Sequence, residues 1–135
     1  MVPGPQAVVA LPPTRFEVHW NGAYLPSSVD ASDFTVNGLA ADGFEWTDAD
    51  TITFTYVASP VSNQGLQGIA VIADSIVKAS DLSTNLGFTS TFRYDATPLQ
   101  VVGISPPLES TLSLGSPWVM DIDFNEAVSP LSIGT

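Results

Sequence analysis

The residues of this chain that are able to do chemistry are mostly carboxylates. Its 135 residues include 14 Asp and Glu, 3 Lys and Arg, one His and no Cys. His19 alternates outward from the apolar residues around it, and the sequence holds no second His or Cys to share a metal ion. No Gly-x-Ser-x-Gly motif supplies an activated serine. The sequence therefore predicts a protein that is not an enzyme, with His19 on its surface.

Two pairs of carboxylates are spaced two residues apart. Asp121 and Asp123 fall on the polar face of an alternating pattern, and Asp48 and Asp50 lie in a predicted turn, where Asp bonds its own backbone. A glycosidase needs two carboxyls, one of them in apolar surroundings that raise its pKa. Neither pair shows such surroundings, so structural roles are favoured and a hydrolase is only the third hypothesis.

Composition excludes several classes of partner. The formal net charge of -11 disfavours nucleic acid and anionic lipid and favours cations. No uninterrupted apolar stretch is longer than 69–73, which is far below the roughly 20 residues that span a bilayer. The first residues lack the basic region of a signal peptide and are interrupted by prolines. We therefore expect no membrane insertion, and we expect any export signal to lie outside this chain.

Period-two alternation of apolar residues is the main structural signal. Such patterns cover residues 15–20, 51–56, 88–94 and 120–124. Asn37-Gly38 and the acidic stretch 47–50 are typical of hairpin connections. A further strand is expected over 68–73, followed by one helical turn near 77–82. About seven short strands between residues 6 and 94 predict an all-β, immunoglobulin-like (Ig-like) Greek-key β-sandwich.

The apolar phases of these strands predict the core. The expected core residues are Phe16, Val18, Trp20, Phe34, Val36, Trp46, Ile52, Phe54, Tyr56, Ile69, Val71, Phe92 and Tyr94. The alternative for Trp20, Trp46 and Trp118 is an exposed row that stacks on sugars. That arrangement would make the chain a carbohydrate-binding module, and it requires two or three coplanar exposed aromatic rings.

Two stretches of the sequence repeat in the same order. Residues 18–28 match 122–132 at an offset of 104, and 6–13 match 100–107 at an offset of 94. Repeats of this size indicate tandem modules. We therefore expect a complete module over 1–95, a linker over 96–98, and the first two strands of a second, truncated module over 99–135. Two strands cannot fold alone, so they are expected to fray, pack on the first module, or pair with another chain.

The junction of the two copies resembles that of bacterial Ig-like domains found in tandem in large cell-surface and secreted proteins. In that family a D-x-T-P linker leads into V…SP, and a later strand ends in F-[NS]-E-x-[VL]; the matching residues are 95–98, 105–106 and 124–128. The resemblance covers essentially the whole chain, although Gly22 stands in the first copy where Glu126 stands in the second. It implies an extracellular or cell-surface location and a spacer, adhesion or assembly role.

Calcium is the cofactor that such an acidic surface suits, because hard cations prefer oxygen ligands. Asp95 and Glu126 are expected at facing poles of consecutive modules, where they could share one ion. The opposite pole of the first module should gather acidic loops. Their residues are Asp30, Asp33, Asp48, Asp50, Asp74 and Asp81. No EF-hand loop is present, so turn capping is the alternative role for these acids.

The sequence thus predicts a non-catalytic Ig-like spacer or adhesion module, with calcium as a candidate ligand. Its expected partners are neighbouring Ig-like modules of the same polypeptide, a protein or polysaccharide ligand, or a second copy bound through the truncated strands. The alternative function is a carbohydrate-binding module attached to a secreted protein.

Overall fold

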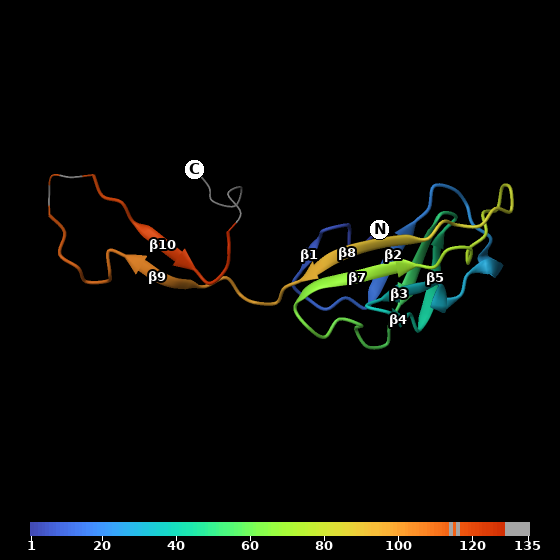
Figure 1. Cartoon of the computed structure of the whole chain (residues 1–135), viewed down its shortest axis with the longest axis horizontal. Helices are drawn as coiled ribbons and strands as arrows, with labels where there is room; N and C mark the ends of the chain where they lie inside the picture. Colours follow the sequence, from blue (N-terminus) through green and yellow to red (C-terminus); the bar gives the residue numbers. More distant parts are fainter. Residues whose placement is uncertain (114, 116, 129–135) are drawn as a thin grey trace. The chain divides into compact units, whose positions relative to one another are not determined.

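The structure is a computed structural model that describes residues 1–113, 115 and 117–128. The chain divides into two compact units, a first unit of Met1–Ala96 and a second unit that starts at Thr97 (Figure 1). Regular structure consists of strands and two single-turn 3-10 helices, η1 at Pro26–Ser28 and η2 at Ala31–Asp33. The predicted all-β fold is confirmed.

The first unit is built from two sheets that pack as the layers of a β-sandwich. One sheet has the strand order β1-β8-β7-β3-β4, and the other has the order β2-β6-β5. The first sheet contains β1 (Val8–Val9), β8 (Phe88–Tyr94), β7 (Gly65–Val71), β3 (Phe34–Val36) and β4 (Leu39–Ala40). The second contains β2 (Arg15–His19), β6 (Thr51–Thr55) and β5 (Gly43–Asp48). All pairings are antiparallel except that of β1 with β8, which is parallel.

Aromatic rings fill the centre of the sandwich. Phe16 of β2 and Phe54 of β6 are direct cross-strand partners and are both fully buried. The Phe54 ring stacks on Phe34 of the opposite sheet, with centroids 4.7 Å apart and planes at 10°. Phe16 also lies 5.9 Å from Phe92 of β8. Because alternate residues of a strand share a face, the alternation in the sequence places these rings in the same hydrophobic core.

Most of the predicted core residues are buried, but Trp46 is not. Trp46 is 59% exposed, and Trp20 and Tyr94 are only partly buried against the core. Trp46 pairs with the buried Ile52, so its phase along the strand is the expected one. However, β5 is the edge strand of its sheet, and its register shifts after Trp46. A side chain at a sheet edge has neighbours on one side only, so the prediction that Trp46 is a core residue was wrong.

The segment between β7 and β8 also differs from expectation. The strand begins at Gly65, and no helix is assigned near 77–82. Residues 72–87 form an extended hairpin instead, in which Val77 bridges Thr84 and one turn is closed by a hydrogen bond from Leu82 N to Lys78 O. The β-branched residues of this stretch explain the preference for extended backbone.

The second unit contains one antiparallel pair, β9 (Val101–Ser105) and β10 (Asp121–Phe124). Many of its apolar side chains are exposed, including Met120 at 67% and Ile122 at 48%. The match of 6–13 with 100–107 fails in three dimensions. β1 pairs in parallel with β8, whereas β9 pairs antiparallel with β10, so the two segments occupy different places in their units.

Candidate functional site

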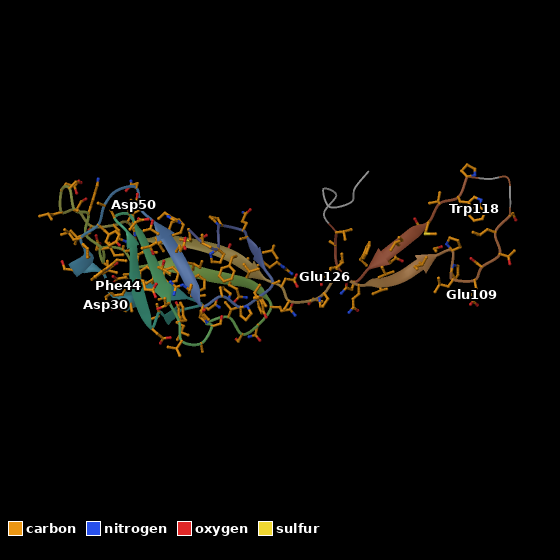
Figure 2. The ribbon with its side chains drawn as sticks, turned by 180° about the vertical axis from the view of Figure 1, so that it is seen from behind. Asp30, Phe44, Asp50, Glu109, Trp118 and Glu126 are labelled. Carbon is orange, nitrogen blue, oxygen red and sulfur yellow. The ribbon has the colours of Figure 1, made fainter. Side chains whose placement is uncertain are left out.

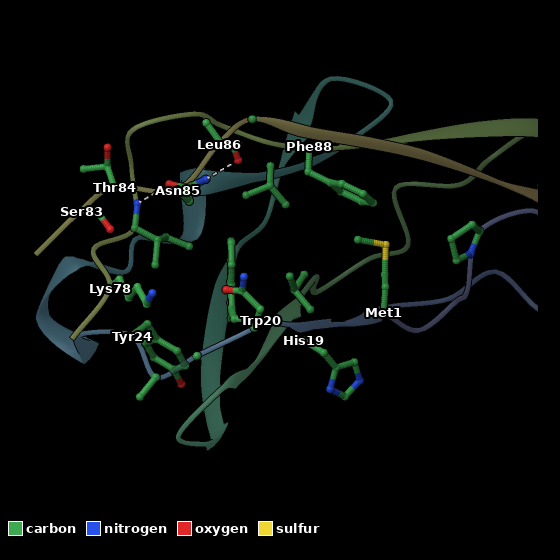
Figure 3. A pocket seen from close by; sticks show the side chains of 18 residues that line it. Met1, His19, Trp20, Tyr24, Lys78, Ser83, Thr84, Asn85, Leu86 and Phe88 are labelled. Atoms are coloured by element: carbon green, nitrogen blue, oxygen red, sulfur yellow. Dashed lines mark hydrogen bonds between the residues drawn. The ribbon is translucent and has the colours of Figure 1, made fainter. Parts of the chain in front are cut away.

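A groove of about 720 Å³ opens in the first unit beside β2 and the start of β8 (Figure 3). We name it the β2–β8 groove. Its walls come from three segments that are far apart in the sequence: 18–24, residues within 71–88, and the N-terminal residues Met1 and Pro5. β2 is the edge of its sheet, and beyond the short β1 the beginning of β8 is also an edge. The groove therefore lies at an open side of the sandwich.

Apolar and polar side chains line the groove together. Leu86 is 87% exposed and Phe88 is 43% exposed, so the apolar wall is open to a ligand. Trp20 is partly buried, and its indole Nε1 is shielded from solvent without a hydrogen-bond partner. Asn21 and Lys78 add amide and ammonium groups. Binding sites combine these features, an apolar surface and a few polar groups that fix orientation.

Asn85 fixes the wall formed by the β7–β8 segment. Its side-chain oxygen accepts hydrogen bonds from the N–H groups of Ser75 (3.0 Å) and Ile76 (2.8 Å). Its side-chain nitrogen donates to the carbonyls of Ile72 (2.7 Å) and Leu86 (3.1 Å). One side chain thus satisfies four backbone groups of this loop, in addition to the loop's own backbone hydrogen bonds, and this holds the wall in place.

Tyr24 ties the facing wall to the body of the sandwich. Its hydroxyl donates to the carbonyls of Asp48 (3.0 Å) and Thr51 (3.2 Å), and its backbone bridges Lys78. Burial raises the pKa of the Tyr24 hydroxyl, and the nearby charges of Asp48 and Asp50 raise it further. Tyr24 therefore stays protonated and acts as a hydrogen-bond donor.

His19 is exposed, as predicted, and its surroundings do not resemble a catalytic triad. Its Nδ1 lies 3.1 Å from Thr51 Oγ1, and the Thr51 hydroxyl donates to Asp50 Oδ1 at 3.3 Å. Its Nε2 lies 3.6 Å from Glu17 Oε2. Thr51 is only 2% exposed, so its hydroxyl is poorly placed to attack a substrate.

The predicted acidic pole is made of separate turn caps. Asp30 accepts from Ser32 N at 3.0 Å, and Asp33 accepts from Asp30 N at 2.7 Å, which forms a capping box around η2. The bonds from Ser32 lower the pKa of Asp30, whereas burial raises the pKa of Asp33. Each carboxylate thus serves its own turn.

The other acids of this pole behave in the same way. Asp48 accepts from Asp50 N at 3.0 Å, Asp81 accepts from Ser83 N at 3.1 Å, and Asp74 accepts from the Thr84 hydroxyl. The hydrogen bond from Asp50 N lowers the pKa of Asp48, and those from the Ser83 hydroxyl and N–H lower the pKa of Asp81. In the described residues, no three acidic or histidine side chains come together as a metal site. Calcium at this pole stays a prediction.

Asp95 and Glu126, the predicted shared ligands, belong to different units. Asp95 follows β8, and its carboxylate lies 3.8 Å from Arg93 Nε. Glu126 follows β10 (Figure 2), and its Oε1 is shielded from solvent without a hydrogen-bond partner. An orphaned carboxylate oxygen of this kind fits a cation ligand. Calcium at these two residues stays a prediction.

Trp20, Trp46 and Trp118 lie in different surroundings. The rings of Trp46 and Phe44 are 6.0 Å apart but are tilted by 53°. Trp118 lies in the second unit (Figure 2), where it is 56% exposed and lines a hollow of about 390 Å³ with Pro106 and Met120. Trp20 faces the β2–β8 groove (Figure 3).

Sequence reasoning missed the groove and its polar residues Asn21, Lys78 and Asn85. Asn21 carried one signal, because it is an identical position of the repeat and matches Asn125. Lys78, the single lysine of the chain, carried another. Nothing in the sequence indicated that the segments containing these residues meet beside β2.

Comparisons with protein-family models, characterised proteins and solved structures found no match. Within the described residues, no helix is long and apolar enough to cross a membrane.

Proposed function

We propose that the chain consists of a non-catalytic Ig-like module, residues 1–95, and the first strands of a second module, and that it spaces or presents neighbouring modules of a bacterial cell-surface or extracellular protein. The strand order of the first unit carries the proposal. An Ig-like sandwich sets strands A, B, E and D against strands C, F and G. Here Val2 bridges β2 beside β6 and β5, and β8, β7 and β3 form the opposing layer.

The second unit supports the tandem part of the proposal. Phe16 and Val18 are 0% and 5% exposed in the first unit, whereas Met120 and Ile122, which stand at the same offset of 104, are 67% and 48% exposed. The same apolar pattern is thus covered in one copy and open in the other. In the part of the second unit that the structure describes, β9 and β10 are the strands present. A following module segment, or a second copy of the chain, would cover it.

Truncation tests the module boundary. A chain ending at Thr97 should melt with the cooperativity and melting temperature of the whole chain, because the first unit closes its own core. Calorimetry of both chains makes the comparison. A large loss of stability would show that β9 and β10 complete the first sandwich, which would contradict two modules.

Calcium binding is a further part of this proposal. It is supported by Glu126 Oε1, which is shielded from solvent and has no hydrogen-bond partner. Extracellular modules bind calcium with Kd values of roughly 10⁻⁴–10⁻³ M. Isothermal titration calorimetry should detect such binding in the whole chain, and Glu126→Gln should abolish it. Glu109→Gln, a change of equal charge in the same unit, is the control (Figure 2). No heat in the unaltered chain would remove calcium from the proposal and leave a plain spacer.

Carbohydrate binding is the second candidate function, because Trp46 is 59% exposed beside Phe44 on an edge strand. Exposed aromatic rings stack on sugar faces. The two rings are tilted by 53°, so they do not form one flat platform.

A further inference from the structure

β5 is an open edge of its sheet. It pairs with β6 on one side, and among the described residues no strand lies on its other side. The residues at its exposed end, 45–50, are all accessible to solvent. An unpaired edge of this kind presents N–H and C=O groups that another strand can bond.

The register of the sheet shows which groups of β5 point outward. Glu17 of β2 directs its N–H and C=O away from β6, to the N-terminal segment. Its direct partner Thr53 must then direct its own groups to the other side, towards β5. Thr53 pairs with Glu45, so Glu45 bonds β6. Alternation along the strand therefore turns the N–H and C=O of Phe44 and Trp46 outward, to the open edge.

The two faces of β5 differ in chemistry. Phe44 and Trp46 lie on the face towards the core, where Phe44 is partly buried and Trp46 is 59% exposed. Glu45 and Thr47 lie on the opposite face, where the Thr47 hydroxyl is 2.6 Å from that of Thr53. A strand added to β5 would therefore place alternate side chains beside aromatic rings and beside polar groups.

Carboxylates without a cationic partner lie at both ends of β5. Asp42 precedes the strand, Asp48 ends it, and Asp50 follows in the turn; all three are exposed. The Lys and Arg residues of the chain, three in all, are ion-paired with other carboxylates. The pairs are Arg15–Glu45, Lys78–Asp81 and Arg93–Asp95. The charge at this edge therefore favours a basic partner.

We propose that β5 binds an extended basic segment of another protein by antiparallel strand addition. The backbone of that segment bonds the outward groups of Phe44 and Trp46. Its alternate residues are apolar and lie beside the two rings, and the residues between them are Lys or Arg, which complement the acidic ends of β5. Strand addition at a sheet edge is an established mode of peptide recognition. The inference goes beyond the spacer role and does not depend on it.

A second copy of the chain is a poorer occupant of this edge. An antiparallel pair of β5 strands would bring the acidic ends of the two copies together, and each chain carries a formal net charge of -11. Charges and bulges commonly protect sheet edges, and β5 has both. Asp42 and Gly43 both oppose Thr55, and the register shifts again after Trp46. The bulges leave residues 43–46 for pairing, and the charges repel an identical edge but attract a basic one.

The test is titration of a fluorescent eight-residue peptide of alternating valine and lysine into the whole chain. Binding should be saturable by fluorescence anisotropy, and it should shift the NMR signals of the Phe44 and Trp46 amides. The same peptide with glutamate in place of lysine should not bind. Absence of saturable binding, or binding that leaves both amide signals unmoved, would overturn the proposal.

N-methylated peptides separate strand addition from attraction between charges. In an antiparallel pair, residues that exchange hydrogen bonds have their side chains on the same face. The valines would therefore bond Phe44 and Trp46, and their N-methylation should weaken binding about tenfold or more. N-methylation of the lysines is the matched control, because it keeps the charge and leaves the bonding N–H groups intact. Equal or reversed effects of the two modifications would refute antiparallel addition.

Asp48→Asn and Asp81→Asn form a matched pair of chain variants. Each carboxylate accepts from the N–H two residues later, which asparagine can also do, and each variant removes one charge. Asp48→Asn should weaken peptide binding about two- to fivefold at low salt, whereas Asp81→Asn, outside β5, should leave it unchanged. Equal loss in the two variants would show attraction to the whole acidic surface instead of to β5.

Light scattering tests the choice of partner. The chain without peptide should remain monomeric at the concentrations used for the titration. Self-association that shifts the Phe44 and Trp46 amides, without binding of the basic peptide, would show that a second copy occupies this edge and would overturn the proposal.

Discussion

Replacing Phe16 by leucine tests whether the aromatic cluster holds the first unit together. Phe16 is fully buried, and its ring centroid lies 5.5 Å from Phe34, 5.6 Å from Tyr56 and 5.9 Å from Phe92. Leucine has a similar transfer free energy, so the loss comes from these contacts and from the space left by the ring. At about 0.5–1.5 kcal/mol for each aromatic pair, Phe16→Leu should lower the free energy of unfolding by about 2–4 kcal/mol.

Calorimetry and urea unfolding measure this loss. A domain of about 100 residues loses about 4–8 °C of melting temperature for each kcal/mol, so the first transition should fall by about 10 °C or more. The dependence of the unfolding free energy on urea should keep its slope, because the surface exposed on unfolding hardly changes.

Met120→Leu is the matched control. Met120 stands at the offset of 104 from Phe16 but is 67% exposed, and exposed substitutions change stability by less than about 0.5 kcal/mol. A loss below that value for Phe16→Leu would refute the aromatic core. A loss for Met120→Leu as large as that for Phe16→Leu would show that the apolar face of the second unit is covered.

Three further predictions concern single side chains. Burial raises the pKa of Asp33 in the folded chain. The stabilising protonated form is therefore present at low pH and is lost as the pH rises through that pKa, so Asp33→Asn should gain stability relative to the unaltered chain between about pH 3 and pH 7. A difference in urea unfolding that stays constant with pH would contradict this. Asn85→Ala leaves the N–H groups of Ser75 and Ile76 without their acceptor. It should lower the free energy of unfolding by about 1–3 kcal/mol and speed hydrogen exchange at both amides. Unchanged exchange would mean that Asn85 does not hold the loop. Trp46→Thr should change stability by less than about 0.5 kcal/mol and should abolish any retardation of the chain in a polysaccharide gel; an unaltered chain that is not retarded would end the carbohydrate hypothesis.

Local patterns in the sequence determined the strands of this protein. The period-two placement of Phe16 and Val18, or of Ile52 and Phe54, follows from the pleat of a strand and needs no partner to be recognised. The Asn37-Gly38 pair likewise predicts a turn, because both residues have positive φ there, 53° and 80°. The all-β fold and most of the core could therefore be predicted.

Position within the sheet was decided only by the tertiary structure. Trp46 has an interior phase, yet it is exposed because β5 is an edge strand. The alignment of the repeat also depended on positions within the sheets that the sequence does not give. Two alternating apolar segments match in more than one register, so 6–13 could be aligned with 100–107 although their pairing partners differ.

The candidate site depended on tertiary structure most of all. Asn21, Lys78 and Asn85 are neutral or common surface residues in the sequence, and they share a groove only because the sandwich brings the end of β2 beside the β7–β8 segment. For the acidic residues, the sequence indicated a shared role that each residue's local hydrogen bonds do not require. Their number suggested a shared ion, but Asp30 and Asp48 each bond the nearest turn N–H. A carboxylate next to its own backbone donors is satisfied locally, so composition gave the charge of this surface and the fold decided how that charge is used.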